Sequence, residues 1–346
     1  MPLRQCLVIV MILMLMCSVG CTDKKNQDNP IDIDSDTNET VEPQEFEPVI
    51  PKVKNPLTGM DMDMEFENKR PMAVMIENEY NARPQSGLDK AGIVYEVLTE
   101  GGITRFLALF LGVKVDEIGP VRSARPYFLD YAMDYDSIYV HYGASPQGYI
   151  DLKKLSLDAI NGMYDSVTFW RDKTRKEPHN AYTNTEKILS ISEKNGFYRD
   201  SKLISWQFNT EETPAGNRIL EEFKLEYFNN YTVSYRYSHN NKAYERFING
   251  KTHTDRKTGE TIFVKNIIVQ FANTRVIDNE GRLSIKTVDS GKGYYISEGS
   301  YTEIKWQKSD RQERTKYTVD DGSELILNPG NIWIQVMPQW GKFNCD

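Results

Sequence analysis

Apolar residues between positions 55 and 215 fall into short runs and into segments with helical spacing. Buried strands are predicted where four apolar runs are bounded by Pro, Gly or polar turns, at 71–78, 92–98, 104–111 and 137–142. Helices are predicted where apolar residues recur at helical spacing or follow a capping residue, at 123–135, 145–155 and 185–194. This order of elements predicts an α+β (or α/β) N-terminal domain over 55–215.

The pattern changes after Tyr227, where polar and apolar residues alternate with the period of two that strands have. Such segments lie at 232–237, 244–248, 262–264, 266–271 and 332–336. Asn249-Gly250, between two of them, is typical of a two-residue hairpin turn. The sequence therefore predicts a mostly-β C-terminal domain over 216–346, with the boundary near the polar segment 211–216.

The first 21 residues have the pattern of an export signal. A positively charged start with Arg4 precedes an apolar stretch of about ten residues, whereas a helix that spans a bilayer needs about 20. Small residues directly before Cys21 resemble the lipobox of bacterial lipoproteins, in which the cysteine is lipidated and the leader is removed. We therefore expect a signal peptide over 1–20 and a membrane-anchored, extracytoplasmic lipoprotein. An ordinary signal peptide with a chance cysteine is the alternative.

Acidic charge is concentrated in the segment that begins at this cysteine. The chain has 346 residues, with 42 Lys+Arg, 50 Asp+Glu and a net charge of -8. Residues 21–54 are rich in Asp, Glu, Asn and Pro and lack apolar periodicity, so they predict a disordered acidic tether. The overall charge argues against a nucleic-acid partner bound through a broad basic face.

The spacing of Cys and His indicates neither disulfides nor a metal site. Three of the four cysteines lie in the first 21 residues and the fourth is Cys345, so no internal disulfide is expected. The sequence contains no HExxH motif and no CxxC pair. We therefore expect no metal and no cofactor.

Five loop segments of the predicted N-terminal domain combine Gly, Arg, His and Asn, residue types that form sites when a rigid scaffold presents them. They are Arg-Pro-Gln-Ser-Gly-Leu at 83–88, Glu-Gly-Gly-Ile-Thr-Arg-Phe at 100–106, Gly-Pro-Val-Arg-Ser-Ala-Arg at 119–125, His-x-Gly-x-Ser-Pro at 141–146 and His-Asn-Ala-Tyr at 179–182. Together these motifs resemble those of the YerB-like bacterial lipoproteins, over a region from about Pro56 to the C-terminus. The resemblance implies an envelope location and N- and C-terminal domains of unassigned function, and it implies no particular reaction or ligand.

Arg122 and Arg125 lie where a loop leads into a predicted helix. Guanidinium groups beside the N–H groups of a helix N-terminus favour a phosphate or a carboxylate. Arginines of two other loops join them if the loops converge. The alternative is that these arginines pair with acidic neighbours such as Asp130 or Glu96 and only hold loops together.

His141 ends a predicted strand, and His179 lies in a separate loop. A histidine at a strand end can act as a general acid or base, and a hydrogen-bonded structural role is the alternative for each. Ser145 nearly matches a nucleophile elbow, but Gly148 stands one position too far along the chain. The following Pro146 identifies Ser145 as a helix cap.

Residues of the predicted β domain leave two further questions. Trp306, Trp333 and Trp340 either stack on carbohydrate or fill the core. His253 and Asp255 follow the hairpin turn on one face of a strand, where surface exposure is the default expectation.

The leading hypothesis is a lipid-anchored extracytoplasmic protein that binds an anionic cell-envelope ligand, such as a phosphate- or carboxylate-bearing glycan or polymer. The candidate ligand-binding residues are Arg83, Arg105, Arg122, Arg125, His141, Ser145, His179 and Asn180. One alternative is an envelope hydrolase or transferase that uses His141 with an arginine anion clamp. The other is a structural partner in a membrane complex. The expected partner in every case is the membrane, through lipidated Cys21.

Overall fold

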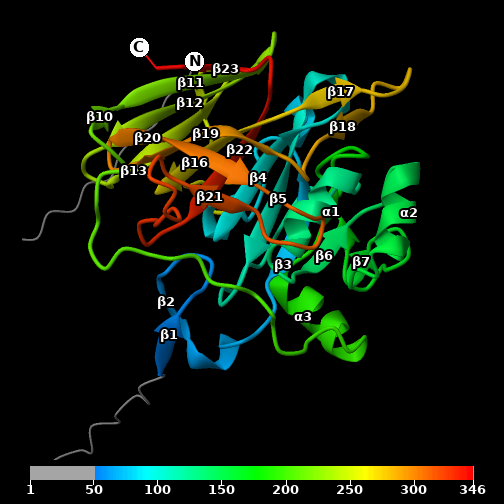
Figure 1. The fold of residues 1–346 in the computed structure, drawn as a ribbon. Helices are drawn as coiled ribbons and strands as arrows, with labels where there is room; N and C mark the ends of the chain where they lie inside the picture. Colours follow the sequence, from blue (N-terminus) through cyan, green and yellow to red (C-terminus); the bar gives the residue numbers. More distant parts are fainter. Residues whose placement is uncertain (1–50, 346) are drawn as a thin grey trace, which may run out of the picture. The chain divides into compact units, whose positions relative to one another are not determined.

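The structure, a computed structural model, describes residues 51–345 (Figure 1). Within this range it contains three α-helices, α1 (Pro126–Met133), α2 (Pro146–Lys154) and α3 (Thr185–Lys194). Proline at the first position presets the helical φ of α1 and α2. The side chains of Ser145 and Asn184 accept backbone N–H bonds at the starts of α2 and α3. The three helices predicted from the sequence are confirmed.

A central sheet of 11 strands contains segments from both ends of the chain (Figure 1). Its strands follow the order β10 (Arg218–Ile219), β20 (Ser300–Gln307), β19 (Ser290–Ser297), β16 (Asn266–Ala272), β22 (Ile332–Pro338), β4 (Ile93–Leu98), β5 (Thr104–Phe110), β3 (Met72–Glu77), β6 (Ile138–His141) and β7 (Ala159–Asn161), with β21 (Lys316–Thr318) paired to β20. Strand β22 pairs in parallel with both β16 and β4. The predicted N- and C-terminal domains therefore contribute strands to one sheet, and the boundary near 215 stays a prediction.

A second, antiparallel sheet of six strands is built from the C-terminal segment alone. Its strands follow the order β14 (Lys251–Thr252), β13 (Ala243–Ile248), β12 (Tyr231–Ser238), β11 (Glu222–Phe228) and β23 (Lys342–Asn344), with β15 (Phe263–Val264) paired to β13. Asn249 and Gly250 adopt φ values of 49° and 75° in the turn between β13 and β14, the left-handed conformation that these two residue types tolerate. The mostly-β character predicted for this part of the chain is confirmed.

Short elements connect and cover the two sheets. The remaining paired strands are β8 (Trp170–Arg171) with β9 (Ala181–Tyr182) and β17 (Thr274–Val276) with β18 (Leu283–Ile285). The 3-10 helices are η1 (Met64–Phe66), η2 (Tyr80–Ala82), η3 (Leu88–Lys90) and η4 (Glu100–Gly102).

The predicted signal peptide, Cys21 and most of the predicted tether lie outside the described residues. The last tether residues, however, form β1 (Lys52–Lys54), which pairs antiparallel with β2 (Asp61–Asp63). Lysines of β1 face aspartates of β2, as in the Lys54–Asp61 pair at 2.8 Å, and opposite charges across a strand pair are stabilising. Placing the end of the tether at residue 54 was therefore wrong. Among residues 51–345, no helix is both long and apolar enough to cross a membrane.

Neighbouring residues of β4 show how the central sheet is covered on both sides. Tyr95 stacks on Tyr131 of α1, with ring centroids 4.6 Å apart. Glu96, the next residue, pairs with Arg246 of β13 at 2.6 Å. Because successive strand residues point to opposite faces, α1 covers one face of the central sheet and the second sheet covers the other. We call these the helix face and the sheet face.

Candidate anion-binding site

The five loop motifs meet around the segment 119–125. Backbone hydrogen bonds join Gly119 to Ser86, Val121 to Ala181, Arg122 to Tyr142 and Ala124 to Gly143. The remaining motif reaches the segment through side chains, since Arg105 donates to the Ser123 carbonyl oxygen at 2.9 Å. Parallel strands β3 and β6 end beside this segment. The carboxyl ends of parallel strands are where open α/β sheets usually bind ligands.

Arg105 projects from the start of β5 onto the helix face. The next residue, Phe106, packs against Trp333 and His253 on the sheet face, with ring centroids 5.5 and 6.0 Å away. Strand alternation therefore directs Arg105 toward α1. Tyr139 and His141, at the end of β6, lie close to each other, with ring centroids 5.5 Å apart.

The Arg105 guanidinium is buried and incompletely paired. The residue is 6% exposed, and within the described part of the chain no carboxylate forms an ion pair with it. Nη1 bonds the Ser123 carbonyl, but Nε is buried without a partner. Burial, together with the charge of Arg125, lowers the pKa of Arg105 to about 10, so the group remains charged at neutral pH. A buried cation with free donors needs a compensating acceptor.

Arg125, the residue before α1, is held by Glu100. Its Nε donates to Glu100 Oε1 at 2.6 Å, and Nη1 donates to the Ala124 carbonyl oxygen at 2.8 Å. Burial alone would raise the pKa of Glu100, but the hydrogen bond and charge of Arg125 and the charge of Arg105 outweigh it and lower that pKa. Glu100 is therefore an ionised carboxylate between two arginines.

Two tyrosines beside these arginines also lack partners. The hydroxyl groups of Tyr127 and Tyr139 are buried without a hydrogen bond among the described residues. Burial raises the pKa of both tyrosines, so each hydroxyl keeps its proton at neutral pH. We define Glu100, Arg105, Arg125, Tyr127 and Tyr139 as the arginine cluster. It contains three buried polar groups that no residue of the described chain satisfies.

Arg122 and His179 are connected through Glu77, the last residue of β3. Arg122 Nε donates to one carboxylate oxygen at 2.8 Å, and His179 Nδ1 lies 2.9 Å from the other. Glu79 lies farther from the same histidine, at 3.7 Å. Arg122 and Arg125 thus form the ion pairs that the alternative interpretation expected, but with Glu77 and Glu100 rather than with Asp130 or Glu96.

His141 ends β6 as predicted, and it is 1% exposed. Its Nδ1 lies 2.7 Å from the carbonyl oxygen of Gly143, which can only accept, so Nδ1 carries the proton. Burial lowers the pKa of His141. The imidazole is therefore neutral at neutral pH.

Three other candidate residues have local structural contacts. Ser145 Oγ accepts the Gly148 N–H at 3.1 Å as the cap of α2. Asn180 Oδ1 accepts from Arg171 at 2.7 Å in a different loop. Arg83 donates to the Asn78 carbonyl oxygen at 2.7 Å and lies over the ring of Tyr231, away from the arginine cluster. The candidate residues therefore do not form one group, since Arg105 and Arg125 lie in the arginine cluster, Arg122 and His179 share Glu77, and these three have partners elsewhere.

A cavity of about 360 Å³ adjoins the arginine cluster. It lies between the starts of α1 and α2 and the β17–β18 hairpin. Glu100, Arg125, Tyr127 and Ser145 are among its lining residues. Arg105 does not line it, but its charge acts on two residues that do, Glu100 and Tyr127.

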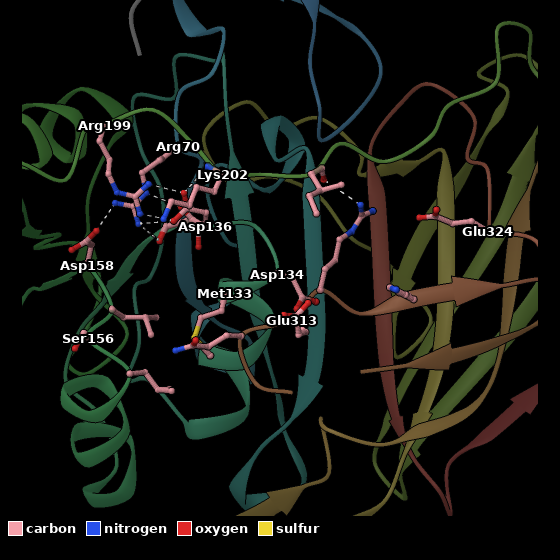
Figure 2. Close-up of a pocket in the computed structure, with 17 residues that line it drawn as sticks. Arg70, Met133, Asp134, Asp136, Ser156, Asp158, Arg199, Lys202, Glu313 and Glu324 are labelled. Carbon is pink, nitrogen blue, oxygen red and sulfur yellow. Dashed lines mark hydrogen bonds and ion pairs between the residues drawn. The ribbon is translucent and has the colours of Figure 1, made fainter. Parts of the chain in front are cut away.

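A larger cavity, of about 580 Å³, contains none of the candidate residues (Figure 2). Buried Arg70 pairs there with Asp158 at 2.5 Å and donates to the Asp136 carbonyl oxygen at 2.7 Å. Arg199 forms two hydrogen bonds with the Asp136 carboxylate, at 2.7 and 2.8 Å. Figure 2 shows these groups pointing toward one another. Because these arginines already have carboxylate partners, this cavity is a weaker candidate for an anion.

A second buried polar group lies on the sheet face. Glu96 accepts from Arg246 at 2.6 Å and from the Tyr231 hydroxyl at 2.5 Å. Arg246 lies 2.5 Å from His253 Nδ1, and His253 Nε2 lies 3.0 Å from Gln85 Oε1. Arginine can only donate, so His253 is neutral, with Nδ1 accepting and Nε2–H donating. We call these five residues the Glu96 network, and within residues 51–345 every buried polar side-chain atom in it has a partner.

Several sequence expectations for the β domain are corrected by this arrangement. His253 and Asp255 were expected at the surface, but they are 3% and 1% exposed. Asp255 accepts the backbone N–H bonds of Gly87 and Leu88, at 2.6 and 3.0 Å, and so ties a loop of the N-terminal segment to the C-terminal one. A surface position is wrong for both because the central sheet and its loops cover this hairpin.

The tryptophans divide between the two roles considered for them. Trp306 and Trp333 are 2% and 0% exposed and fill the core, whereas Trp340 is 46% exposed. Only Trp340 of these three is therefore placed to contact a carbohydrate.

Sequence reasoning did not single out Glu77, Glu100, Tyr127 or Tyr139. Tyr139 could have been predicted from the sequence, because it lies two residues before His141 on the same strand and therefore shares its face. Glu77 likewise ends a predicted strand. Within the described chain, no group of three or more His, Cys, Asp or Glu side chains is arranged to hold a metal ion.

The fold defines a class of two-part α+β proteins whose N- and C-terminal segments share one sheet. Residues 57–198 match the "Protein of unknown function (DUF3048) N-terminal domain", and residues 223–334 match the corresponding C-terminal domain. The chain is 37% identical over 291 residues to "Putative lipoprotein YerB" of Bacillus subtilis (strain 168), covering 83% of this chain and 87% of the relative. The chain therefore belongs to the YerB-like family.

A solved structure supports the same assignment. The crystal structure of the YerB protein from Bacillus subtilis matches this chain with a TM-score of 0.76 at 36% identity. The match covers 85% of this chain and 100% of that chain. The predicted family and fold class are confirmed.

Proposed function

We propose that this protein is a lipid-anchored extracytoplasmic binding protein that holds an anionic cell-envelope ligand at the arginine cluster. The observation that carries the proposal is Arg105, a buried cation that has no carboxylate partner within the described chain and a free Nε donor. The hydroxyl groups of Tyr127 and Tyr139 provide two further free groups beside it. An anion placed among them would satisfy all three and offset the cost of burying the charge.

Glu100 would compete with the ligand anion for Arg125. Its carboxylate lies on Arg125, where an incoming phosphate or carboxylate would bind. Gly101 and Gly102 follow it with φ values of 74° and 69°, a backbone that permits the short η4 segment to turn sharply. A ligand anion would displace Glu100 from Arg125 and gain contact with both arginines.

The N-terminal pattern and the name of the relative support the anchoring part of the proposal. Cys21 directly follows small residues after an apolar stretch, and the relative at 37% identity carries a lipoprotein name. Mass spectrometry of protein purified from its host should show a diacylglycerol on Cys21, and Cys21→Ala should release the protein from the membrane fraction. An unmodified Cys21 would contradict the anchor without touching the ligand proposal.

Binding is better supported than hydrolysis or group transfer. His141 would be the acid or base of such an enzyme, but no nucleophilic side chain of the described chain is hydrogen-bonded to it. Ser145, the serine whose sequence context nearly matches a nucleophile elbow, serves as the cap of α2.

Isothermal titration with inorganic phosphate at low salt tests the anion proposal. Glu100→Gln should bind about fivefold more tightly than the parent, the equivalent of about 1 kcal/mol, because it removes the competing charge. Arg125→Met should weaken binding at least tenfold, and Arg105→Met should abolish it. The matched control, Arg199→Met, removes an arginine paired with Asp136 outside the cluster and should bind like the parent. Equal phosphate binding by all four variants would refute the proposal.

A further inference from the structure

The cavity beside the arginine cluster has two chemically different walls. The wall from the N-terminal segment carries Glu100, Arg125 and the Tyr127 ring. The opposite wall comes from the β17–β18 hairpin and the residues after it. Its apolar lining residues are Ile277, Leu283, Ile285 and Val288. At about 360 Å³ the cavity falls in the size range of small-molecule pockets.

The apolar wall is only partly covered by the protein itself. Leu283 and Ile285 are each 8% exposed, but Ile277 and Val288 are 53% and 40% exposed. Large aliphatic side chains that line a cavity and remain in contact with water are stabilised when a ligand covers them.

Two ion pairs and one hydrogen bond hold the elements around the cavity together. Arg311 bonds Asp130 of α1 at 2.6 Å and Asp151 of α2 at 2.9 Å. Thr287, which follows β18, donates to the same Asp130. Arg311 thereby joins α1 to α2, and Thr287 attaches the segment after the hairpin to α1. The cavity is therefore formed before any ligand arrives and requires little ordering on binding.

We infer that the ligand of this cavity is an amphiphile, with an anionic head at Arg125 and Arg105 and an apolar segment against Ile277 and Val288. The inference rests on the proposed function and adds the second half of the ligand. A uniformly polar phosphate or sugar would leave the apolar wall wet, whereas an uncharged lipid would leave the Arg105 donors without a partner. Lys286, which also lines the cavity, adds positive charge, whereas Arg282 is paired with Asp278 and Glu280.

Titration of the full-length protein with ethyl, butyl and hexyl phosphate tests this inference against inorganic phosphate. Each methylene that enters the cavity should tighten binding about fourfold, the equivalent of about 0.8 kcal/mol, until the cavity is filled. The alcohols of the same chain lengths should bind at least tenfold more weakly, because they lack the charged head.

Variants of the apolar wall show whether the alkyl chain binds in the cavity or at another apolar surface of the protein. Ile277→Ser and Val288→Ser should each reduce the gain per methylene while leaving the affinity for inorganic phosphate unchanged. Val276→Ser is the matched control, since Val276 is 61% exposed on the same hairpin and does not line the cavity. Its chain-length dependence should equal that of the parent.

The outcomes distinguish the two proposals. Phosphate binding that is sensitive to Arg105→Met but equal for all chain lengths would overturn the amphiphile and leave the anion site intact. Chain-length dependence that all three serine variants retain would also overturn it, because the apolar segment would then lie elsewhere. Failure of both phosphate and alkyl phosphates to bind would overturn the anion site and the amphiphile together.

Discussion

The two faces of strands β4 and β5 carry two buried polar groups that differ in one respect. On the sheet face, Glu96 and Arg246 are both fully buried, and their partners complete every hydrogen bond. On the helix face, Arg105 is almost as buried, yet Nε has no partner among the described residues. One strand step separates Arg105 from Phe106, which packs beside the Glu96 network.

The Glu96 network, whose hydrogen bonds are complete, joins two parts of the chain, whereas the arginine cluster, which has free donors among the described residues, can accept a ligand. Glu96 belongs to the N-terminal segment and Arg246 to the C-terminal one, so their pair connects the two sheets. A satisfied buried network adds specificity to the fold and has no capacity left for another molecule. Free buried donors are uncommon in native proteins, and a free donor on a charged group such as Arg105 is especially costly to leave without a partner.

The largest effect should come from breaking the Glu96 network. Arg246→Met leaves Glu96 as an unpaired buried charge and should lower the free energy of unfolding by about 3–5 kcal/mol, measured by urea denaturation. Adding Glu96→Gln removes that charge and should recover part of the loss. Arg236→Met is the matched control on β12, since its pair with Glu222 is exposed and should be worth at most about 1 kcal/mol. An equal loss in Arg246→Met and Arg236→Met would contradict the comparison.

Removing single tyrosine hydroxyl groups should change the free energy of unfolding by less, and the two sites should differ. Loss of the hydroxyl should be costly in the Glu96 network and not in the arginine cluster. Tyr231→Phe deletes a hydrogen bond to the Glu96 carboxylate and should cost about 1.5–3 kcal/mol. Tyr127→Phe removes a hydroxyl that has no partner among the described residues, and should be neutral or slightly stabilising in the absence of ligand. Thermal unfolding of the two variants beside the parent measures the difference. A comparable cost for both would show that the Tyr127 hydroxyl is satisfied.

His253 should make the Glu96 network sensitive to acid. Burial and the charges of Arg246 and Arg83 lower its pKa well below the usual value of about 6.5. Below about pH 6.5 the unfolded chain therefore binds a proton that the folded chain refuses, and the free energy of unfolding falls as pH decreases. His141, also lowered by burial, acts in the same direction.

The effect is measured by urea denaturation between pH 7.5 and pH 5. His253→Gln should flatten the dependence on pH, whereas His239→Gln, at a side chain that is 74% exposed, serves as the control. A His253→Gln variant with the parent's slope would remove His253 as the cause.

The smallest effect on stability should come from Arg105. Arg105→Met replaces a buried, incompletely paired charge with an apolar chain of similar length, which should change the free energy of unfolding by less than about 1 kcal/mol in either direction. The same substitution at Arg246 costs several times more. Stability that is retained while phosphate binding is lost would establish Arg105 as a binding residue. A loss as large as that of Arg246→Met would place it among the structural ion pairs.

Local pattern was sufficient to predict the three helices of the described residues and several of the buried strands. The helix over 185–194 and the strand that ends at His141 were predicted because capping residues and apolar periodicity are encoded in neighbouring residues. The sequence did not predict that the five motifs converge on segment 119–125. The anion hypothesis only required that their loops converge, and convergence depends on the order of the strands in the sheet.

The partners of charged residues could not be predicted in the same way. The alternative interpretation named Glu96 as a partner of Arg122 or Arg125, but Glu96 points to the sheet face and pairs with Arg246. Alternation along β4 indicates that Glu96 and Tyr95 diverge, but not which element covers either face. His253 was misplaced for the same reason, because the central sheet and a loop from a distant part of the chain bury it.

The position of β22 in the central sheet has a consequence for the order of folding. This strand, Ile332–Pro338, is among the last to be synthesised, yet it lies between β16 and β4. Until it is in place, β4 has an open edge that can pair with another chain. The long-range pairings of β22 delay completion of the sheet until nearly the whole polypeptide is available. A chain truncated before residue 332 should therefore aggregate or be degraded rather than persist as a half-folded N-terminal domain.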